Sequence, residues 1–174
     1  MAEQDISLLQ HLDTPQLTCL NENPQHTLKS IVASKTKNTG SAYVLSDADE
    51  QLLLNIPFNQ TVKIRSIAIQ SSNIPQAPKK IRLLTNRPSL NFEDVEDEHS
   101  VLQEIDLSED DVREGKRIDL RFVRFQSVTS LHVNIFVVSN QGGEDETRID
   151  AIDIFGMPVM GTRDVSGLRK VEDE

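Results

Sequence analysis

Acidic residues gather in short clusters along this chain, and clustered carboxylates are the groups that bind calcium or act as acid–base pairs. The clusters lie at 47–50, 93–98, 109–111 and 144–146. A calcium loop needs oxygens at staggered positions with a glycine at its bend. Asp47 and Asp49 alternate but no glycine follows them, and the glycines of GGEDE (142–146) precede the acids. The spacing favours solvated acidic loops.

Hydrolysis by a pair of carboxylates is a second chemistry that such clusters could perform. Enzymes of this kind usually bind sugar rings in a groove that contains aromatic platforms. The chain has no tryptophan and a single tyrosine, Tyr43. The sequence therefore does not favour a glycoside hydrolase.

Histidine and cysteine offer no clear alternative. The four histidines, His11, His26, His99 and His132, show neither HxH nor HxxxH spacing, which disfavours a zinc site. The single cysteine, Cys19, lies between leucines in QLTCLNE and is expected to be a buried thiol. The motifs CxxC, GxSxG, GxGxxG and GxxxxGK[ST] are absent from the sequence. We predict a protein that is not an enzyme and uses no cofactor or metal.

Composition narrows the possible partners. Acidic residues outnumber basic ones by 28 to 18, which gives a net charge of −10. This charge disfavours nucleic acid and anionic membrane as partners and favours a basic or polar protein surface. No apolar run approaches the roughly 18–20 residues that cross a bilayer, and MAEQDISLLQHL does not resemble a secretory signal. A lone cysteine fits a reducing compartment, and we expect the cytoplasm and nucleus.

The elements that would position these residues are mainly strands. Short β-type segments recur every 8–15 residues or so without a long amphipathic helix, which predicts an all-β sandwich or barrel in one domain. A short helix or turn is expected near residues 6–12, a loop around Gly40, and strands at 51–58, 81–86 and 148–156. In TVKIRSIAIQ, Val62 and Ile64 share one parity whereas Ile67 and Ile69 share the other. We predict a β-bulge near residues 65–66 that brings all four to one face.

Two further segments show local signals. SEDDVREG predicts one turn of helix, with Ser108 as its N-cap, Asp111 at the third helical position and Gly115 at its end. In the strand that follows, Leu131, Val133, Ile135 and Val137 alternate with His132 and Asn134, and we expect both faces of this strand to be covered. The glycines and acids of GGEDE are expected to cap a hairpin between two long strands.

Five segments, taken in order, resemble the PITH domain, the proteasome-interacting C-terminal domain of thioredoxin-like proteins. They are LTCLNE (17–22), LSDADEQLLLNIPF (45–58), LNFEDVE (90–96), LRFVRFQSVTSLHVNIFVVSNQGGEDETRI (120–149) and FGMPV (155–159). The resemblance implies a jelly-roll β-sandwich similar to galactose-binding-like domains, and docking onto the regulatory particle of the 26S proteasome. It divides the chain into an N-terminal extension (1–16), the PITH sandwich (17–160) and a C-terminal tail (161–174). The WCGPC motif of a thioredoxin domain is absent, so redox activity is not carried over.

Two elements are the candidates for partner contact. One is the acidic turn with its neighbouring cation: Glu144, Asp145, Glu146 and Arg148. The other is the tail, in which Leu168, Arg169, Lys170 and Val171 form a short apolar and basic peptide. We expect a monomer that acts as a docking domain. The alternative is a jelly-roll module that binds a glycan or small ligand at one end of the sandwich.

Overall fold

The computed structural model describes residues 5–87, 90–94, 100–136 and 139–159. The strands are β1 (Ile6–Ser7), β2 (Thr18–Leu20), β3 (Val44–Leu45), β4 (Leu52–Gln70), β5 (Lys80–Thr85), β6 (Gln103–Asp106), β7 (Ile118–Asp119), β8 (Val128–Ile135), β9 (Arg148–Ile149) and β10 (Ala151–Pro158). Short helices join them: α1 (Leu28–Val32), α2 (Glu109–Glu114) and the 3₁₀ turns η1 (Leu8–His11), η2 (Thr14–Gln16), η3 (Ile74–Gln76) and η6 (Phe122–Arg124). The predicted all-β class is confirmed. In the described part of the chain, no helix is long and apolar enough to cross a membrane.

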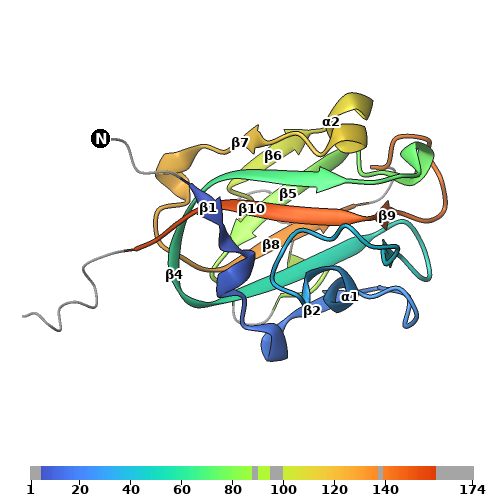
Figure 1. Ribbon diagram of the computed structural model, residues 1–174. Coiled ribbons are helices and arrows are strands. Elements are labelled where there is room, and N and C mark those ends of the chain that lie inside the picture. Colours follow the sequence, from blue (N-terminus) through green and yellow to red (C-terminus); the bar gives the residue numbers. More distant parts are fainter. Residues whose placement is uncertain (1–4, 88–89, 95–99, 137–138, 160–174) are drawn as a thin grey trace, which may run out of the picture.

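One long strand, β4, organises the sheet. The strand order is β1-β10-β4-β8-β5-β6, and β2 and β7 also pair with β4. The first half of β4 pairs with β8, and the second half pairs with β10. Figure 1 shows β4 curving round one end of the molecule so that it contributes to both layers of the curled sheet. The sequence predicted two separate strands here, and the structure joins them.

Pro57 marks the place where β4 leaves its first partner. The pairing with β8 runs without interruption as far as Pro57 and resumes at Val62, with a register shift between them. Proline has no backbone N–H to donate to a neighbouring strand, so it is tolerated where the pairing ends. The bend lets a single strand serve two layers.

The predicted β-bulge is confirmed at Arg65. Phe155 pairs with Ser66 and Gly156 pairs with Ile64, so Arg65 is the extra residue on β4. The inserted residue returns the apolar side chains to one face, and all four predicted residues belong to the main core. The close approach of the two strands also requires a glycine, because a Cβ at position 156 would overlap the carbonyl oxygen of Lys63.

The core fills the space inside the curled sheet, and a smaller cluster covers its outer face. Leu131, Val133 and Ile135 of β8 belong to the main core. On the opposite face of the same strand, His132 is 2% exposed and Asn134 is fully buried. The expected covering of both faces of β8 is therefore confirmed for the described residues.

The short helix α2 has the predicted ends. The Ser108 hydroxyl accepts the backbone N–H of Asp111, and the Asp111 carboxylate accepts the N–H of Ser108. Gly115 ends the helix in the left-handed conformation, with φ of 66°. The capping box and the glycine stop are both confirmed.

The N-terminal residues pack closely against the sandwich. β1 pairs with β10, and the following 3₁₀ turn, η1, buries Leu8 and Leu9 completely in the core. The predicted short helix is thus present, and its described residues are part of the same hydrophobic core as the sheet.

The predicted hairpin around GGEDE is wrong. The strands on either side of it, β8 and β10, do not pair with each other, because β4 lies between them. The segment is instead a crossover that passes through β9, which pairs with β3. Local turn signals cannot distinguish a hairpin from a crossover of this kind, since the difference lies in which distant strand fills the gap.

Candidate functional site

The candidate acids lie in a loop, residues 139–147, that we call the acidic loop. Asn140 is 3% exposed and holds the loop from inside. Its side-chain nitrogen donates to the carbonyls of Glu144 at 2.9 Å and Glu146 at 3.2 Å, while its oxygen accepts the Glu144 N–H at 2.7 Å. Thr147 is fully buried at the end of the loop, and its hydroxyl donates to the Glu50 carbonyl at 2.6 Å. Sequence reasoning missed Asn140, although an asparagine shortly before two glycines is a common turn signal.

The two glycines of the acidic loop have different roles. The Gly142 N–H donates to the Pro75 carbonyl at 2.8 Å, and a Cβ at position 142 would lie 2.9 Å from that same oxygen. Gly143 has φ of +66°, a conformation that glycine adopts without strain. Gly142 thus brings the acidic loop against η3, and Gly143 allows the loop to turn.

The acid side chains themselves point to solvent. Glu144 and Asp145 are exposed and Glu146 is half-buried. Within the part of the chain that the structure describes, none of the three takes part in an ion pair. Their charges are therefore available to a cationic partner.

Arg148 lies close in sequence but faces other residues. Its guanidinium donates to the Asp150 carboxylate through Nε at 3.0 Å and Nη2 at 2.9 Å, and Nη2 also contacts the Ser72 hydroxyl at 3.0 Å. The Asp150 carboxylate further accepts the backbone N–H and the hydroxyl of Ser72. Burial raises the pKa of Asp150, but the hydrogen bonds from Arg148 and Ser72 outweigh it, so the pKa of this carboxyl lies below its usual value.

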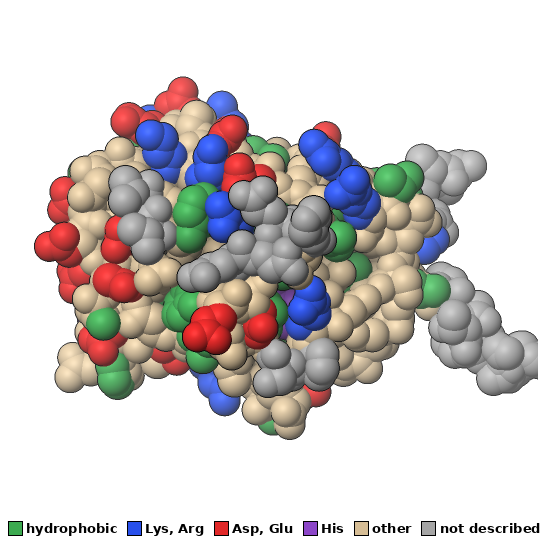
Figure 2. Space-filling view, turned by 180° about the vertical axis from the view of Figure 1, so that it is seen from behind, with side chains coloured by type: hydrophobic (Ala, Val, Ile, Leu, Met, Phe, Trp, Pro, Cys, Tyr) green, Lys and Arg blue, Asp and Glu red, His purple; other side chains and the backbone are tan. Residues whose placement is uncertain are grey.

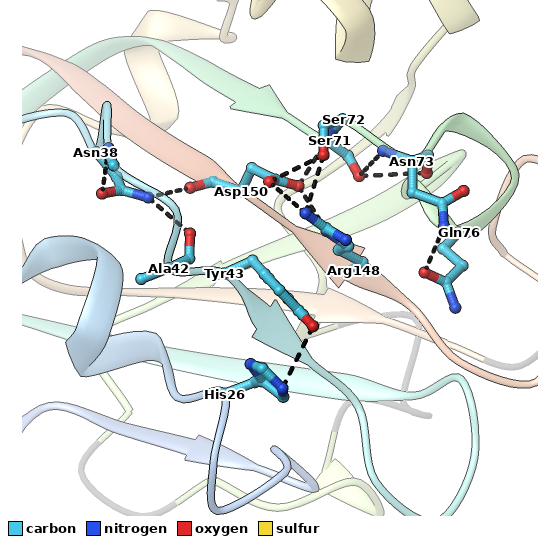
Figure 3. Close-up of polar contacts among 11 residues, drawn as sticks. His26, Asn38, Ala42, Tyr43, Ser71, Ser72, Asn73, Gln76, Arg148 and Asp150 are labelled. Atoms are coloured by element: carbon cyan, nitrogen blue, oxygen red, sulfur yellow. Dashed lines mark hydrogen bonds and ion pairs between the residues drawn. The ribbon is translucent and has the colours of Figure 1, made fainter.

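An aromatic pair extends this cluster. The Arg148 guanidinium lies 3.7 Å from the centre of the Tyr43 ring, and Tyr43 stacks on His26 with ring centres 4.1 Å apart. Figure 3 shows Tyr43 between His26 and Arg148, with Asp150 and Ser72 beyond the arginine. Arg148 of β9 and four residues from connecting segments thus form one continuous set of contacts, which we call the Arg148 stack: His26, Tyr43, Arg148, Asp150 and Ser72.

A hollow of about 540 Å³ adjoins the Arg148 stack. Asn38 forms one wall, and its side-chain nitrogen donates to the carbonyls of Ala42 at 2.8 Å and Asp150 at 2.9 Å. Two cations, Lys37 and Arg113, also line it. Its polar groups are shared among neighbouring loops and form no set of a nucleophile with an adjacent base.

A second hollow, of about 440 Å³, opens over the outer face of β4 and β8. His132 donates from Nδ1 to the Asn55 side chain at 2.7 Å, and its Nε2 accepts from the Arg87 backbone at 3.2 Å and the Ser130 hydroxyl at 3.1 Å. Asn55 in turn donates to the Thr18 hydroxyl at 3.1 Å. Burial, with the charge of Arg87, lowers the pKa of His132 to about 4. Both ring nitrogens are used, so His132 is held as a neutral structural group.

The other chemistry-bearing residues do not converge. Cys19 is buried, and burial, together with the nearby charge of Glu22, raises the pKa of its thiol well above the usual range. No group of three or more His, Cys, Asp or Glu among the described residues could hold a metal ion. The tail candidates Leu168, Arg169, Lys170 and Val171 lie outside the described residues.

Comparison with known proteins gives a consistent family. The model of the PITH domain matches residues 1–173. The chain is 42% identical over 166 residues to thioredoxin-like protein 1 of Schizosaccharomyces pombe, which covers 92% of this chain and 54% of that protein. It is 33% identical over 146 residues to PITH domain-containing protein 1 of Homo sapiens, which covers 83% of this chain and 66% of that protein. The chain thus spans about half the length of the yeast relative.

Solved structures share the fold at low sequence identity. A family 32 CBM from C. perfringens NanJ, solved in complex with galactose, is 12% identical with a TM-score of 0.60, and the match covers 87% of this chain and 98% of that one. A SusE-like protein is 15% identical with a TM-score of 0.62 and covers 89% of this chain and 68% of that one. The predicted galactose-binding-like jelly roll is therefore confirmed. At such identities the likeness carries the fold alone.

Proposed function

This chain belongs to the PITH domain family, and we propose that it is a non-catalytic interaction domain that docks onto the regulatory particle of the 26S proteasome. The observation that carries the proposal is family membership over residues 1–173, with a thioredoxin-like protein among the relatives. The proteasome is proposed as the partner because the sequence resembles a domain that interacts with the proteasome. We further propose that the domain is a monomer that acts in the cytoplasm and nucleus.

The geometry of the acidic loop supports a docking role. Glu144 and Asp145 are exposed on a loop that Asn140 fixes from inside, so little conformational freedom is lost when a partner binds. Opposite charges across an interface steer encounter and set specificity more than they add affinity. An acidic rim of this kind suits a basic surface of a large assembly.

Capture of purified 26S particles by the immobilised chain tests the proposal. The variant Glu144→Gln/Asp145→Asn/Glu146→Gln neutralises the acidic loop and is expected to reduce capture, most clearly at low salt. A matched control, Asp106→Asn/Glu109→Gln/Glu114→Gln, removes the same charge from exposed residues elsewhere and should leave capture unchanged.

Crosslinking mass spectrometry on the captured complex would identify the subunit contacted. A wild-type chain that ignores proteasomes would refute the docking function. If both variants lost capture equally, the acidic loop would not be the contact surface, although the domain would still dock onto the proteasome. A chain truncated after Gly161 tests the tail, since undiminished capture would eliminate Leu168–Val171.

The glycan-binding alternative rests on the fold of its structural neighbours. One observation weighs against it at the Arg148 stack. Tyr43, the only tyrosine in the chain, lies between His26 and Arg148, so its ring offers no open face on which a sugar could stack. A thermal-shift screen against simple sugars discriminates, because sugar-dependent stabilisation that survives added salt would favour the alternative.

A further inference from the structure

A third hollow, of about 450 Å³, lies between the edge of the sheet and the connection that carries η6. Its walls come from β5, from β6 at the sheet edge, and from η6 with the residue before it. Three arginines line it: Arg82, Arg121 and Arg124. We call it the arginine hollow.

Two hydrogen bonds fix the arginines around this hollow. The Arg121 backbone N–H donates to the side-chain oxygen of Gln103 at 2.8 Å, and Arg124 donates from Nη1 to the Leu102 carbonyl at 2.8 Å. Arg121 precedes η6 and Arg124 ends it, and residues three apart in a 3₁₀ turn lie on the same side. The turn therefore presents both guanidinium groups to the hollow together.

The charges in the arginine hollow are not balanced. Arg82 has a carboxylate partner, Glu104, at 3.1 Å, and its guanidinium also lies 3.9 Å from the centre of the Phe136 ring. Among the described residues, Arg121 and Arg124 form no ion pair with any carboxylate. Among the described residues that line the hollow, three guanidinium groups thus face one carboxylate, in a protein whose net charge is −10.

The surroundings of the hollow match a protein ligand. Val123, between Arg121 and Arg124 on the same turn, is 77% exposed, the most exposed large hydrophobic residue among those the structure describes. The rear view in Figure 2 shows Lys and Arg side chains over the upper part of this face, with Asp, Glu and apolar side chains among them. Paired guanidinium groups recognise carboxylates by bidentate hydrogen bonds, and an apolar neighbour adds contact area.

We propose that the arginine hollow binds an acidic peptide segment of a partner protein, with Asp or Glu carboxylates on Arg121 and Arg124 and an apolar side chain near Val123. Charge complementarity selects this occupant, because an anionic segment would be repelled by most of the remaining surface of an acidic protein. The hollow is large enough for one or two side chains, not for a folded domain. The proposal concerns a different surface from the acidic loop and does not depend on docking to the proteasome.

Fluorescence polarisation with a labelled peptide tests this site. The probe is a short synthetic peptide of alternating Asp, Glu and Leu, and its counterpart carries Asn and Gln in place of the acids. The wild-type chain should bind the acidic probe, more weakly as salt rises, and should ignore the amide counterpart. The variant Arg121→Glu/Arg124→Glu should weaken binding by about tenfold or more, as loss of charge-assisted hydrogen bonds predicts.

The matched control is Lys29→Glu/Lys37→Glu, which makes the same change in net charge at exposed lysines elsewhere. It should bind the probe about as well as the wild type does. Arg121→Ala alone is a milder variant that removes a side chain with no ion pair, and circular dichroism would confirm that it folds. Its affinity should fall between those of the wild type and the double variant.

Four outcomes would overturn the proposal. They are failure of the wild type to bind, equal binding of the amide peptide, an equal loss in the lysine control, and self-association that the arginine variant abolishes. A fifth concerns the sequence VEDE at the C-terminus. If a chain that ends at Gly161 bound the probe much more tightly, the natural occupant of the hollow would be the acidic segment 171–174 of this chain.

Discussion

Arg148 and Asp150, two residues apart, face the same side of the chain and share two hydrogen bonds, from Nε to Oδ1 at 3.0 Å and from Nη2 to Oδ2 at 2.9 Å. Residues at i and i+2 of an extended chain point to one face, which makes this short-range pairing possible. The pair lies in the Arg148 stack, with about one fifth of each side chain exposed. The guanidinium that the sequence offered as a partner contact is thus already engaged within the protein.

Arg148→Ala is expected to destabilise the fold by about 1–2 kcal/mol, because it removes charge-assisted hydrogen bonds and leaves the half-buried Asp150 with Ser72 alone. Arg148→Lys should recover little, since an ammonium cannot form both parallel bonds. Urea unfolding measures the change in stability of both variants. Arg113→Ala is the control: its partners Glu109 and Asp110 are exposed, so the loss should stay below about 0.5 kcal/mol. Equal losses at Arg148 and Arg113 would contradict the role given to the stack.

The second prediction concerns acid and His132. Its folded-state pKa is lowered to about 4 from 6.5, so between these values the unfolded chain binds a proton that the folded chain does not. Unfolding free energy should therefore fall as pH decreases from 6.5 towards 4, by at most about 3 kcal/mol from this group. His132→Gln cannot titrate and should flatten the curve over this range, whatever it costs in stability at pH 7. Parallel curves for the two proteins would contradict the burial of a neutral imidazole.

Local signals in the sequence gave the parts of the fold that depend on neighbouring residues. The parity change between Ile64 and Ile67 predicted the bulge at Arg65, because a buried face leaves only one way to accommodate it. The ends of α2 could be predicted from Ser108, Asp111 and Gly115, because capping residues bond to the backbone of their own helix. In each case the interacting groups lie within a few residues of one another.

Long-range pairings were beyond such signals. The acidic loop was predicted as a hairpin because nothing near Gly142 reveals that β4 separates β8 from β10. The role of Arg148 depends on Tyr43 and Ser72, which are far away in sequence. The arginine hollow likewise joins Arg82 to Arg121 and Arg124 across the sheet edge. Strand pairing brings the residues of such sites together from distant parts of the chain, and the spacing of residues along the sequence does not predict that pairing.

The third prediction tests the caps of α2. Ser108→Ala removes the acceptor for the Asp111 N–H and should cost about 1 kcal/mol, whereas Ser108→Asp keeps an acceptor and should cost little. Gly115→Ala places a side chain at φ of +66° and within 3.3 Å of Gln70, and it should cost about 1 kcal/mol or more. Gly115→Asn should be better tolerated, since asparagine adopts this conformation more readily. Thermal unfolding ranks the four variants, and an Ala variant as stable as wild type would contradict the capping geometry.

The last prediction concerns Gly156, where the bulged strands come closest. Its partner across the sheet is Ile64, and the Lys63 carbonyl occupies the space that a side chain at 156 would need. The obstructing atoms belong to the backbone of a central strand, so they cannot move away as a flexible side chain could. Gly156→Ala should therefore cost more than Gly115→Ala, about 3 kcal/mol or more, and should reduce soluble yield. Gly143→Ala is a useful comparison, because nothing lies within 4 Å of its Cβ and only the positive φ opposes it. An order of stability in which Gly156→Ala ranks above Gly143→Ala would show that β4 and β10 do not approach as described, and the bulge at Arg65 would then have to be reassigned.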